Sequence, residues 1–460
     1  MELSHYVQLI AGIALAVTAF VAAYAAPARM VMALLLVIAP FEVINSQFGT
    51  SSTGLVYLVA LALWLRNGIN RFPLLWPVLG ILLAYAISLA MANVRALDHV
   101  LYIVRILPGF LLFYIAYNYV RESRGAVGFI NILLVINVLV LVVCTLQLVG
   151  GAQQVVLFGI NEFALMENRT AQGRLSGPFG AEFTSEYLAL ASLLLAYLLM
   201  NKGLGRRWPV WLRWGLLAGN LGFMVATGSR GGILVLLVGL VWGAFLFRRE
   251  LGAGRTLGFL LGAALVASVM SALIVQFTDY NVLFERLGGT EIKGGIIDSR
   301  SVTWPVAWEA IKERPLLGYG PRLRLHEDLV YPIPGHKPIP YPHSLPLFLL
   351  YTLGVVGLIA YTIFFALLLG RFYRGSRARP PNESSGLAKL GFILLVLFLL
   401  DEIKIEFLRF IQSDYQAIIF SLFGGLLAMA DKARTSVNHV RPEVVARRRL
   451  LNSTGARQEM

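Results

Sequence analysis

The sequence has little charge and almost no cysteine. Only 14% of its 460 residues are charged and 58% are hydrophobic, whereas average soluble domains have about 25% and about 45–50%. Acidic residues are scarcer than basic ones, with 25 Asp and Glu against 39 Lys and Arg, so the formal charge is +14. The single Cys144 excludes an intrachain disulfide and a cysteine-ligated metal cluster. This composition argues against an ordinary soluble domain.

Several motifs that carry established chemistries are also missing. The chain has no Gly-x-x-x-x-Gly-Lys loop, which argues against a nucleotide-driven pump. It has no His-Glu-x-x-His motif and no Cys/His cluster, and its six histidines are scattered. The first outer loop, 45–52, lacks an Asp-x-Asp pair of the kind that holds a metal. The sequence therefore predicts no cofactor and no resident metal.

Long hydrophobic runs dominate what is present. They have about the length that crosses a bilayer as a helix, the structure that satisfies its own backbone polar groups in lipid. The predicted fold class is an all-α polytopic membrane protein with about 12–13 transmembrane helices and a large, partly helical outer loop before the last two or three spans. The runs lie at 6–25, 28–44, 53–65, 74–92, 99–120, 126–149, 183–200, 209–226, 231–247, 256–276, 344–370, 387–401 and 414–430.

The basic charge is distributed unevenly between the two predicted sides of the membrane. One side sums to about +18 and the other to about −4, and basic loops face the cytoplasm. The C-terminal tail is therefore expected inside and, with an odd number of spans, the N-terminus outside. Only Glu2 precedes the first apolar run as a charge, so we expect a retained anchor rather than a cleaved signal. The excess charge thus indicates topology rather than nucleic-acid binding.

The loops and spans divide the chain into four parts. Residues 1–276 form transmembrane helices interrupted by an outer loop at 150–182, and residues 277–343 form a large outer, periplasmic loop. Residues 344–430 form the C-terminal transmembrane helices, and 431–460 form a basic cytoplasmic tail. Long loops in compact proteins are often functional, so the two outer loops are the places to search for chemistry.

One candidate anion site is the sequence Thr227-Gly-Ser-Arg-Gly-Gly232 at the outer start of a span. Its glycines allow close backbone approach and leave N–H groups for an anion, and a helix N-terminus adds partial positive charge. The Arg230 guanidinium matches phosphate oxygens in a bidentate manner. The alternative is an arginine that only snorkels to the interface.

Two further charged residues lie at or within the membrane. Arg105 lies one to two turns inside its predicted span, where a charge needs a partner or a water-filled cavity. It could pair with Glu186 or Asp401, or contact substrate. His343 directly precedes span 344–370 at the outer surface, where it could act as a general base or merely anchor the interface.

The last outer stretch contains charges at helical spacing. On a helix, Glu402, Glu406 and Arg409 would share one face by i, i+4 and i+3 spacing. The pattern predicts a salt-bridged interfacial helix, with a paired-carboxylate acid/base site as the alternative.

The order of these motifs resembles that of the O-antigen ligase/O-antigen polymerase superfamily (the Wzy–WaaL type). The resemblance covers about residues 220–360. It rests on the Thr227–Gly232 motif, Arg300 followed by Trp304, Arg314-Pro-Leu-Leu-Gly-Tyr-Gly320, and His343-Ser-Leu followed by Leu353-Gly-Val-Val-Gly357.

The resemblance implies a function for the outer-face residues. Members of the superfamily take a glycan from undecaprenyl pyrophosphate on the outer side of the bacterial inner membrane. Ligases pass it to lipid A–core, polymerases pass it to the next lipid-linked repeat, and related members act on exopolysaccharides. By this resemblance Arg230 and Arg300 would bind the pyrophosphate and stabilise its developing charge. His343 would position or deprotonate the acceptor hydroxyl in an inverting, metal-independent transfer.

Other outer residues are second-tier candidates for substrate binding. The resemblance implies that these residues contact the undecaprenyl-pyrophosphate-linked glycan or the acceptor, and it implies no nucleic-acid partner. A polyprenyl-glycan flippase is the competing class, but such transporters show repeated halves, and the sequence shows none. A membrane scaffold would leave the motifs unexplained. The second-tier residues are Arg314, Arg286, Arg322, Arg105 and Tyr319.

Overall fold

The structure is a computed structural model of the 460-residue chain. It describes residues 14, 16–41, 51–91, 96–122, 125–149, 174–201, 208–277, 292–293, 296–297, 300–320, 342–378, 383–408 and 414–432.

Helices make up nearly all of the regular structure in these residues. Each predicted apolar run contains a helix, and seven of the described helices are long and apolar enough to cross a membrane. The all-α polytopic prediction is therefore confirmed. The helices are Ala16–Ala25, α2 (Ala28–Ile38), α3 (Ser51–Leu65), α4 (Leu75–Met91), α5 (Ala96–Arg121), α6 (Gly125–Val149), α8 (Ala181–Met200), α9 (Val210–Thr227), α10 (Arg230–Leu251), α11 (Ala253–Phe277), α13 (Arg300–Glu313), α14 (Leu345–Ser376), α15 (Glu383–Asp401) and 414–432.

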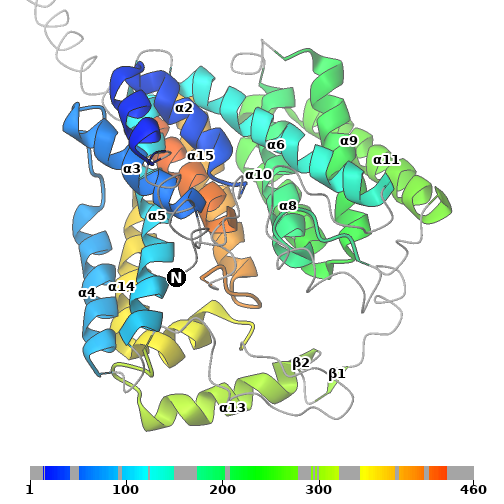
Figure 1. Cartoon of the computed structure of the whole chain (residues 1–460). Helices are drawn as coiled ribbons and strands as arrows, with labels where there is room; N and C mark the ends of the chain where they lie inside the picture. Colours follow the sequence, from blue (N-terminus) through cyan, green and yellow to red (C-terminus); the bar gives the residue numbers. More distant parts are fainter. Residues whose placement is uncertain are drawn as a thin grey trace, which may run out of the picture.

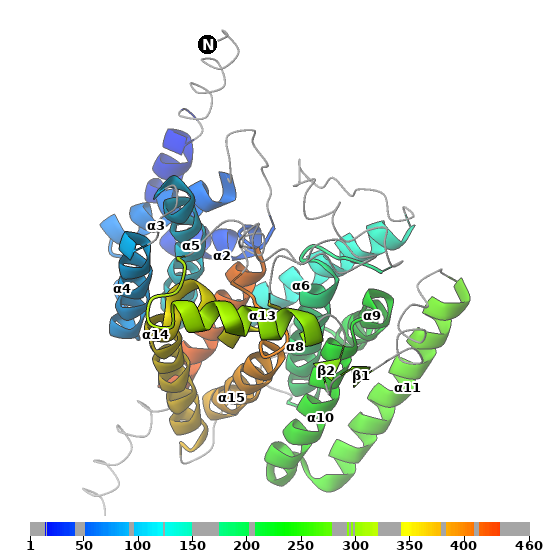
Figure 2. The ribbon, with the colours of Figure 1, turned by 90° about the horizontal axis from the view of Figure 1, so that it is seen from below.

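The described helices form two groups with α15 between them. Helices α2 to α5 and α14 lie on the left in Figure 1, and α8 to α11 lie on the right. Helix α15 packs against α14 on one side and against α8 and α10 on the other. Helix α13 runs across one end of the helices, as Figure 2 shows from below. The predicted large loop therefore contains a helix that lies over the membrane-spanning part.

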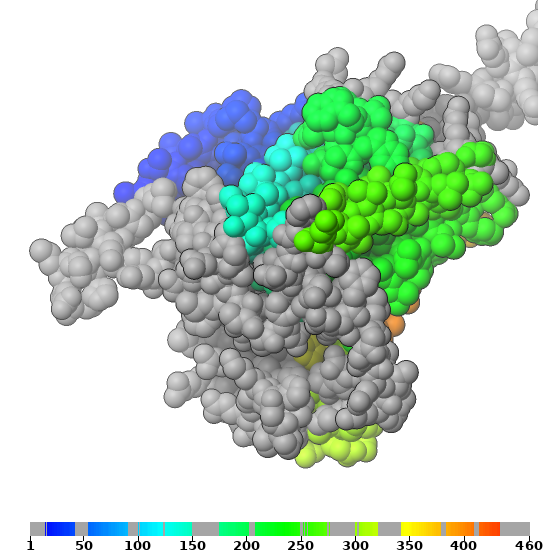
Figure 3. Space-filling model, turned by 90° about the vertical axis from the view of Figure 1, so that its right-hand side faces the viewer, coloured from blue at the N-terminus to red at the C-terminus, as the bar shows by residue number. Residues whose placement is uncertain are grey.

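Helix α11 illustrates the lipid-facing surface. It lies along the outside of the molecule in Figure 3. Leu257, Leu261 and Leu265, spaced by four residues, are 59%, 63% and 66% exposed. Such an apolar stripe would be unfavourable in water but suits contact with lipid.

A two-stranded ladder in the large loop was not predicted. Strand β1 (Ile292–Lys293) pairs antiparallel with β2 (Ile296–Ile297). Each strand has only two residues, too few for a period-2 pattern to be recognised in the sequence.

Helix α14 is broken at Gly354. This glycine has φ 65° and ψ −165°, a conformation that is essentially restricted to glycine. The chain from Pro315 to Gly320 lies against the break. The Tyr319 and Gly320 N–H groups donate to the carbonyls of Tyr351 and Thr352, both at 2.9 Å.

The contact between these two segments is continued on the other side of the break. The Val355 N–H donates to the Pro315 carbonyl at 2.8 Å. On α4, the Ser88 hydroxyl donates to the carbonyls of Leu317 and Thr352 at 2.8 and 3.0 Å. Backbone groups freed by a helix break must find partners within the protein, and the 315–320 loop supplies them. Much of the Arg314–Gly320 motif is thus explained by helix packing.

Candidate active site

Three sequence motifs meet at the mostly buried stretch at the end of α15, residues 401–408 (the 401–408 segment). They are the motifs that contain Arg230, Arg300 and His343. The Leu345 N–H, at the start of α14, donates to the Glu402 carbonyl at 2.8 Å. Arg300, at the start of α13, donates to the Lys404 carbonyl. The Lys404 side chain in turn lies against Gly231 at the start of α10. Elements far apart in the sequence therefore share one small region.

Arg300 is held by the backbone of this segment. Its Nε and Nη2 atoms lie 3.3 and 2.8 Å from the Lys404 carbonyl oxygen, and the side chain is partly buried. A guanidinium has five N–H donors, so this carbonyl orients the group and occupies only part of its donor set. A rigidly oriented guanidinium is suited to an anionic ligand.

Arg230 begins α10 after an abrupt turn. Gly228 has φ 61° and ends α9, Ser229 is extended, and Arg230 is the first helical residue. The prediction of an arginine at the start of a span is confirmed. The side chain is half-buried. A Cβ on Gly231 would overlap the Lys404 ammonium, and one on Gly232 would overlap the Ser185 hydroxyl. Both glycines therefore permit close packing at this helix start.

A second arginine beside this turn was not predicted. The Arg174 Nε donates to the Thr227 carbonyl at 2.7 Å, and one of its terminal nitrogens lies 4.0 Å from the Glu182 carboxylate. The Leu175 N–H donates to the Ala226 carbonyl at 3.0 Å. The sequence analysis named the surrounding outer loop as a place to search for chemistry, but Arg174 belongs to no motif that would single it out.

The 401–408 segment contains three buried carboxyl groups, those of Asp401, Glu402 and Glu406. The Lys404 Nζ lies 2.6 Å from Asp401 Oδ1, and the Phe407 N–H donates to Glu402 Oε2 at 2.8 Å. Burial, reinforced by the nearby Glu186 carboxyl, raises the pKa of Glu402 well above its ordinary value, and the bond from Phe407 opposes this only partly. Glu406 is also fully buried.

The predicted interfacial helix at this place is wrong. Residues 402–408 form turns, and Glu402 and Glu406 are buried instead of exposed on a helix face. Their i, i+4 spacing fits a helix, but Ile405, Phe407 and Leu408 are also buried, so the segment folds inward as a compact turn. Arg409 lies outside the described residues.

His343 lies at the entrance of α14. It has φ 50°, a left-handed conformation that is uncommon for residues other than glycine. The next residue, Ser344, is the extended N-cap of α14, and Leu345 is bonded to Glu402. His343 is half-buried and is therefore placed within two residues of a direct contact with the 401–408 segment. Such a backbone conformation is found where the surrounding structure enforces it.

The residues predicted as second-tier substrate contacts do not gather at one place in the structure. Arg105 is half-buried on α5, one turn after Tyr102, whose hydroxyl donates to the Leu408 carbonyl at 2.6 Å. Asp401, one of its suggested partners, forms its ion pair with Lys404. Arg286 and Arg322 lie outside the described residues.

Arg314 and Tyr319 lie at the opposite end of α13 from Arg300. The 14 residues of α13 separate the two ends by roughly 20 Å. The Arg314 guanidinium lies 4.9 Å from the centre of the Tyr319 ring, which stacks on Tyr351 at 4.9 Å. The Tyr319 hydroxyl donates to Glu313 at 2.7 Å. Burial and this carboxylate raise the pKa of Tyr319 to about 12.

These contacts give an expectation for Tyr319→Phe. The variant keeps the ring stack on Tyr351 and loses the bonds to Glu313 and to the Ala310 carbonyl. We expect a loss of about 1 kcal/mol in stability, measured by thermal unfolding in detergent, with an unchanged KM for the donor. A several-fold rise in that KM at unchanged stability would instead support the predicted substrate-binding role.

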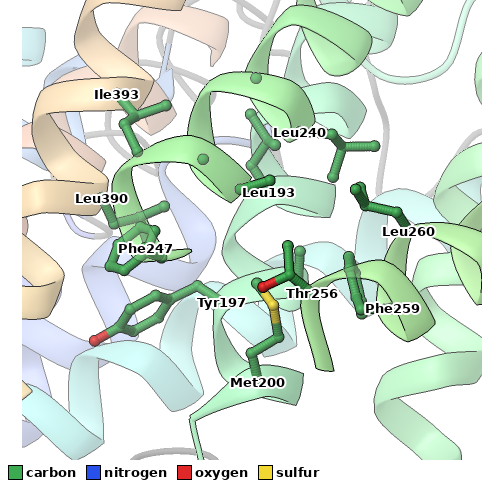
Figure 4. A pocket seen from close by; sticks show the side chains of 14 residues that line it. Leu193, Tyr197, Met200, Leu240, Phe247, Thr256, Phe259, Leu260, Leu390 and Ile393 are labelled. Atoms are coloured by element: carbon green, nitrogen blue, oxygen red, sulfur yellow. The ribbon is translucent and has the colours of Figure 1, made fainter. Parts of the chain in front are cut away.

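An apolar cavity lies between α8, α10, α11 and α15, away from these charges. Figure 4 shows its lining side chains, among them Leu193, Phe247, Phe259 and Leu390. Met200, which also lines it, is 14 residues along α8 from Glu186, or roughly 21 Å. No charged residue lines the cavity. It therefore does not provide the ligands that a phosphate requires.

The comparison with known families agrees with the motif pattern. Residues 215–362, about a third of the chain, match the family described as O-antigen ligase. No curated protein matches the chain. The matched part begins in α9, ends in α14 and includes Arg230, Arg300 and His343.

The fold gives the structural class of this protein, and the match describes one part of it. It is a polytopic α-helical membrane protein, and its residues 215–362 match the family described as O-antigen ligase. The match is a similarity over this part of the chain, and it favours a ligase or polymerase activity of the glycosyltransferase kind as the function to be tested.

Proposed function

We propose that the protein transfers a glycan from undecaprenyl pyrophosphate to an acceptor hydroxyl at the periplasmic face of the inner membrane. Our first candidate is the ligase reaction with lipid A–core as acceptor, and our alternative is an O-antigen or exopolysaccharide polymerase. The observation that supports the proposal is the meeting of the Arg230, Arg300 and His343 motifs at the 401–408 segment.

The proposed reaction is a single displacement. The acceptor oxygen forms a bond to the anomeric carbon while the bond from that carbon to the pyrophosphate oxygen breaks, which inverts the configuration. The acceptor proton passes to a nitrogen of His343, and the electron pair leaves with the pyrophosphate. Fixed guanidinium groups stabilise charge that develops on the departing oxygens and need no reorganisation at that moment. A histidine has the appropriate basicity near neutral pH.

Metal independence is part of the proposal. Among the described residues no group of three or more His, Cys, Asp or Glu side chains could hold a metal ion. The cations that would neutralise the pyrophosphate are arginines, which keep their charge at any physiological pH. We expect the transfer rate of the purified protein to stay within about twofold after EDTA treatment and dialysis. A loss that added Mg²⁺ or Mn²⁺ restores would contradict this part of the proposal.

The acceptor can be identified from the glycans of a strain that lacks this protein. If the protein is the ligase, we expect gels of lipopolysaccharide to lose all polymer attached to lipid A–core. A core that still carries a single repeat would instead identify a polymerase. Re-expression of the full chain should restore the wild-type ladder, and an unchanged ladder would contradict both reactions.

A further inference from the structure

Lys404 lies between the two arginine motifs and belongs to neither. Its ammonium is 2.6 Å from Asp401 Oδ1. The Asp401 side chain is 2% exposed, whereas the Lys404 side chain is 33% exposed. The buried carboxylate therefore holds the ammonium of a side chain that is itself partly exposed.

The Lys404 side chain lies against Gly231, the residue that follows Arg230 in α10. A Cβ on Gly231 would overlap both the Cε and the Nζ atoms of Lys404, so the ammonium lies directly over the backbone of the residue that follows Arg230. The carbonyl of the same lysine receives the Arg300 guanidinium at 2.8 Å. Backbone and side chain of one residue thus join the two arginine motifs.

From this arrangement we propose that Lys404 is a third cation that binds the pyrophosphate of the donor, and that Asp401 positions it. This inference rests on the proposed function. An ammonium has three N–H donors, and Asp401 uses one, which leaves donors for phosphate oxygens. Gly231 is required because any side chain there would displace the ammonium.

Lys404→Gln removes the charge and keeps most of the side chain. In purified full-length protein we expect a donor KM at least about tenfold higher, the cost of losing one charge-assisted hydrogen bond, with an unchanged acceptor KM. Lys404→Arg should recover part of the loss. Undecaprenyl pyrophosphate at one fixed concentration should raise the melting temperature of Lys404→Gln less than that of the wild type.

The glycine supplies an independent variant. Gly231→Ala should raise the donor KM as Lys404→Gln does, because the added methyl displaces the ammonium. Gly243→Ala on the same helix, where a Cβ has nothing within 4 Å, is the matched control and should behave as wild type. In a Lys404→Ala background, Gly231→Ala should add little, since the two changes remove the same contact.

The outcomes separate this inference from the proposed function. If the wild type transfers glycan and Lys404→Gln has the wild-type donor KM and the wild-type response to undecaprenyl pyrophosphate, the inference is overturned and the function stands. Fully additive effects of Gly231→Ala and Lys404→Ala would also overturn it. If the wild type itself transfers no glycan, the proposed function fails.

Discussion

Arg230→Ala is expected to abolish glycan transfer and to leave the amount of protein in the membrane unchanged. Arg230 begins α10, and the next residue, Gly231, lies against the Lys404 ammonium in the segment that also holds Arg300. Removal of one fixed donor to a developing anion costs about 10²–10³ in rate, and a guanidinium that carries a full charge belongs at the upper end. The transfer rate of purified protein and the glycan ladder of cells would both show the loss.

His343→Ala should give the same loss for a different reason. It removes the proton acceptor and leaves the cationic cluster in place, so the variant should still be stabilised by undecaprenyl pyrophosphate. Arg374→Ala is a suitable control, because this arginine is in the last turn of α14 at the end opposite His343 and bonds only the Gly370 carbonyl among the contacts described. Full transfer by Arg230→Ala or His343→Ala would contradict the site assignment.

Gly354→Ala is expected to prevent most of the protein from folding. The conformation at Gly354 is nearly inaccessible to other residues, and a Cβ there would overlap the backbone of Leu316 and Leu317. Strain and overpacking together amount to at least about 3 kcal/mol, a large part of a total stability of about 5–15 kcal/mol. The amount of protein in membranes and its melting temperature in detergent should both fall sharply.

The same helix offers the control for this prediction. Gly370 is also in α14, has ordinary helical conformation, and an added methyl group there would have nothing within 4 Å. Gly370→Ala should therefore be neutral or slightly stabilising, as alanine is the better helix former. If Gly354→Ala reached the wild-type level and melting temperature, the interaction between the 315–320 loop and the break in α14 would not have the role described.

The helices could be predicted from the sequence because a membrane span is recognised from the apolar residues of one continuous segment. A run such as 126–149 is apolar throughout, and α6 is found at Gly125–Val149. The start of α10 at Arg230 was also accessible, because the glycines that flank it mark a helix boundary. The break in α14 was not, because Leu353-Gly-Val-Val-Gly357 is equally compatible with a continuous apolar helix.

The composition of the site depends on contacts between distant residues. The Lys404 side chain lies against Gly231, and its carbonyl accepts a hydrogen bond from Arg300. No spacing in the sequence reveals either contact. Arg174 reaches Thr227 from another outer loop in the same way. The motif residues could thus be named from the sequence, whereas the segment that connects them was assigned the wrong local structure.

The most direct test of the central claim is a transfer assay on the purified protein in detergent. The mixture contains the full-length chain, a polyprenyl-pyrophosphate-linked glycan and an acceptor, with no second compartment across which anything could be transported. We predict that glycosylated acceptor and free polyprenyl pyrophosphate form in equal amounts, and that neither forms with Arg230→Ala. A protein that makes no product in detergent but moves the lipid-linked glycan across a vesicle bilayer would contradict the proposed transferase function.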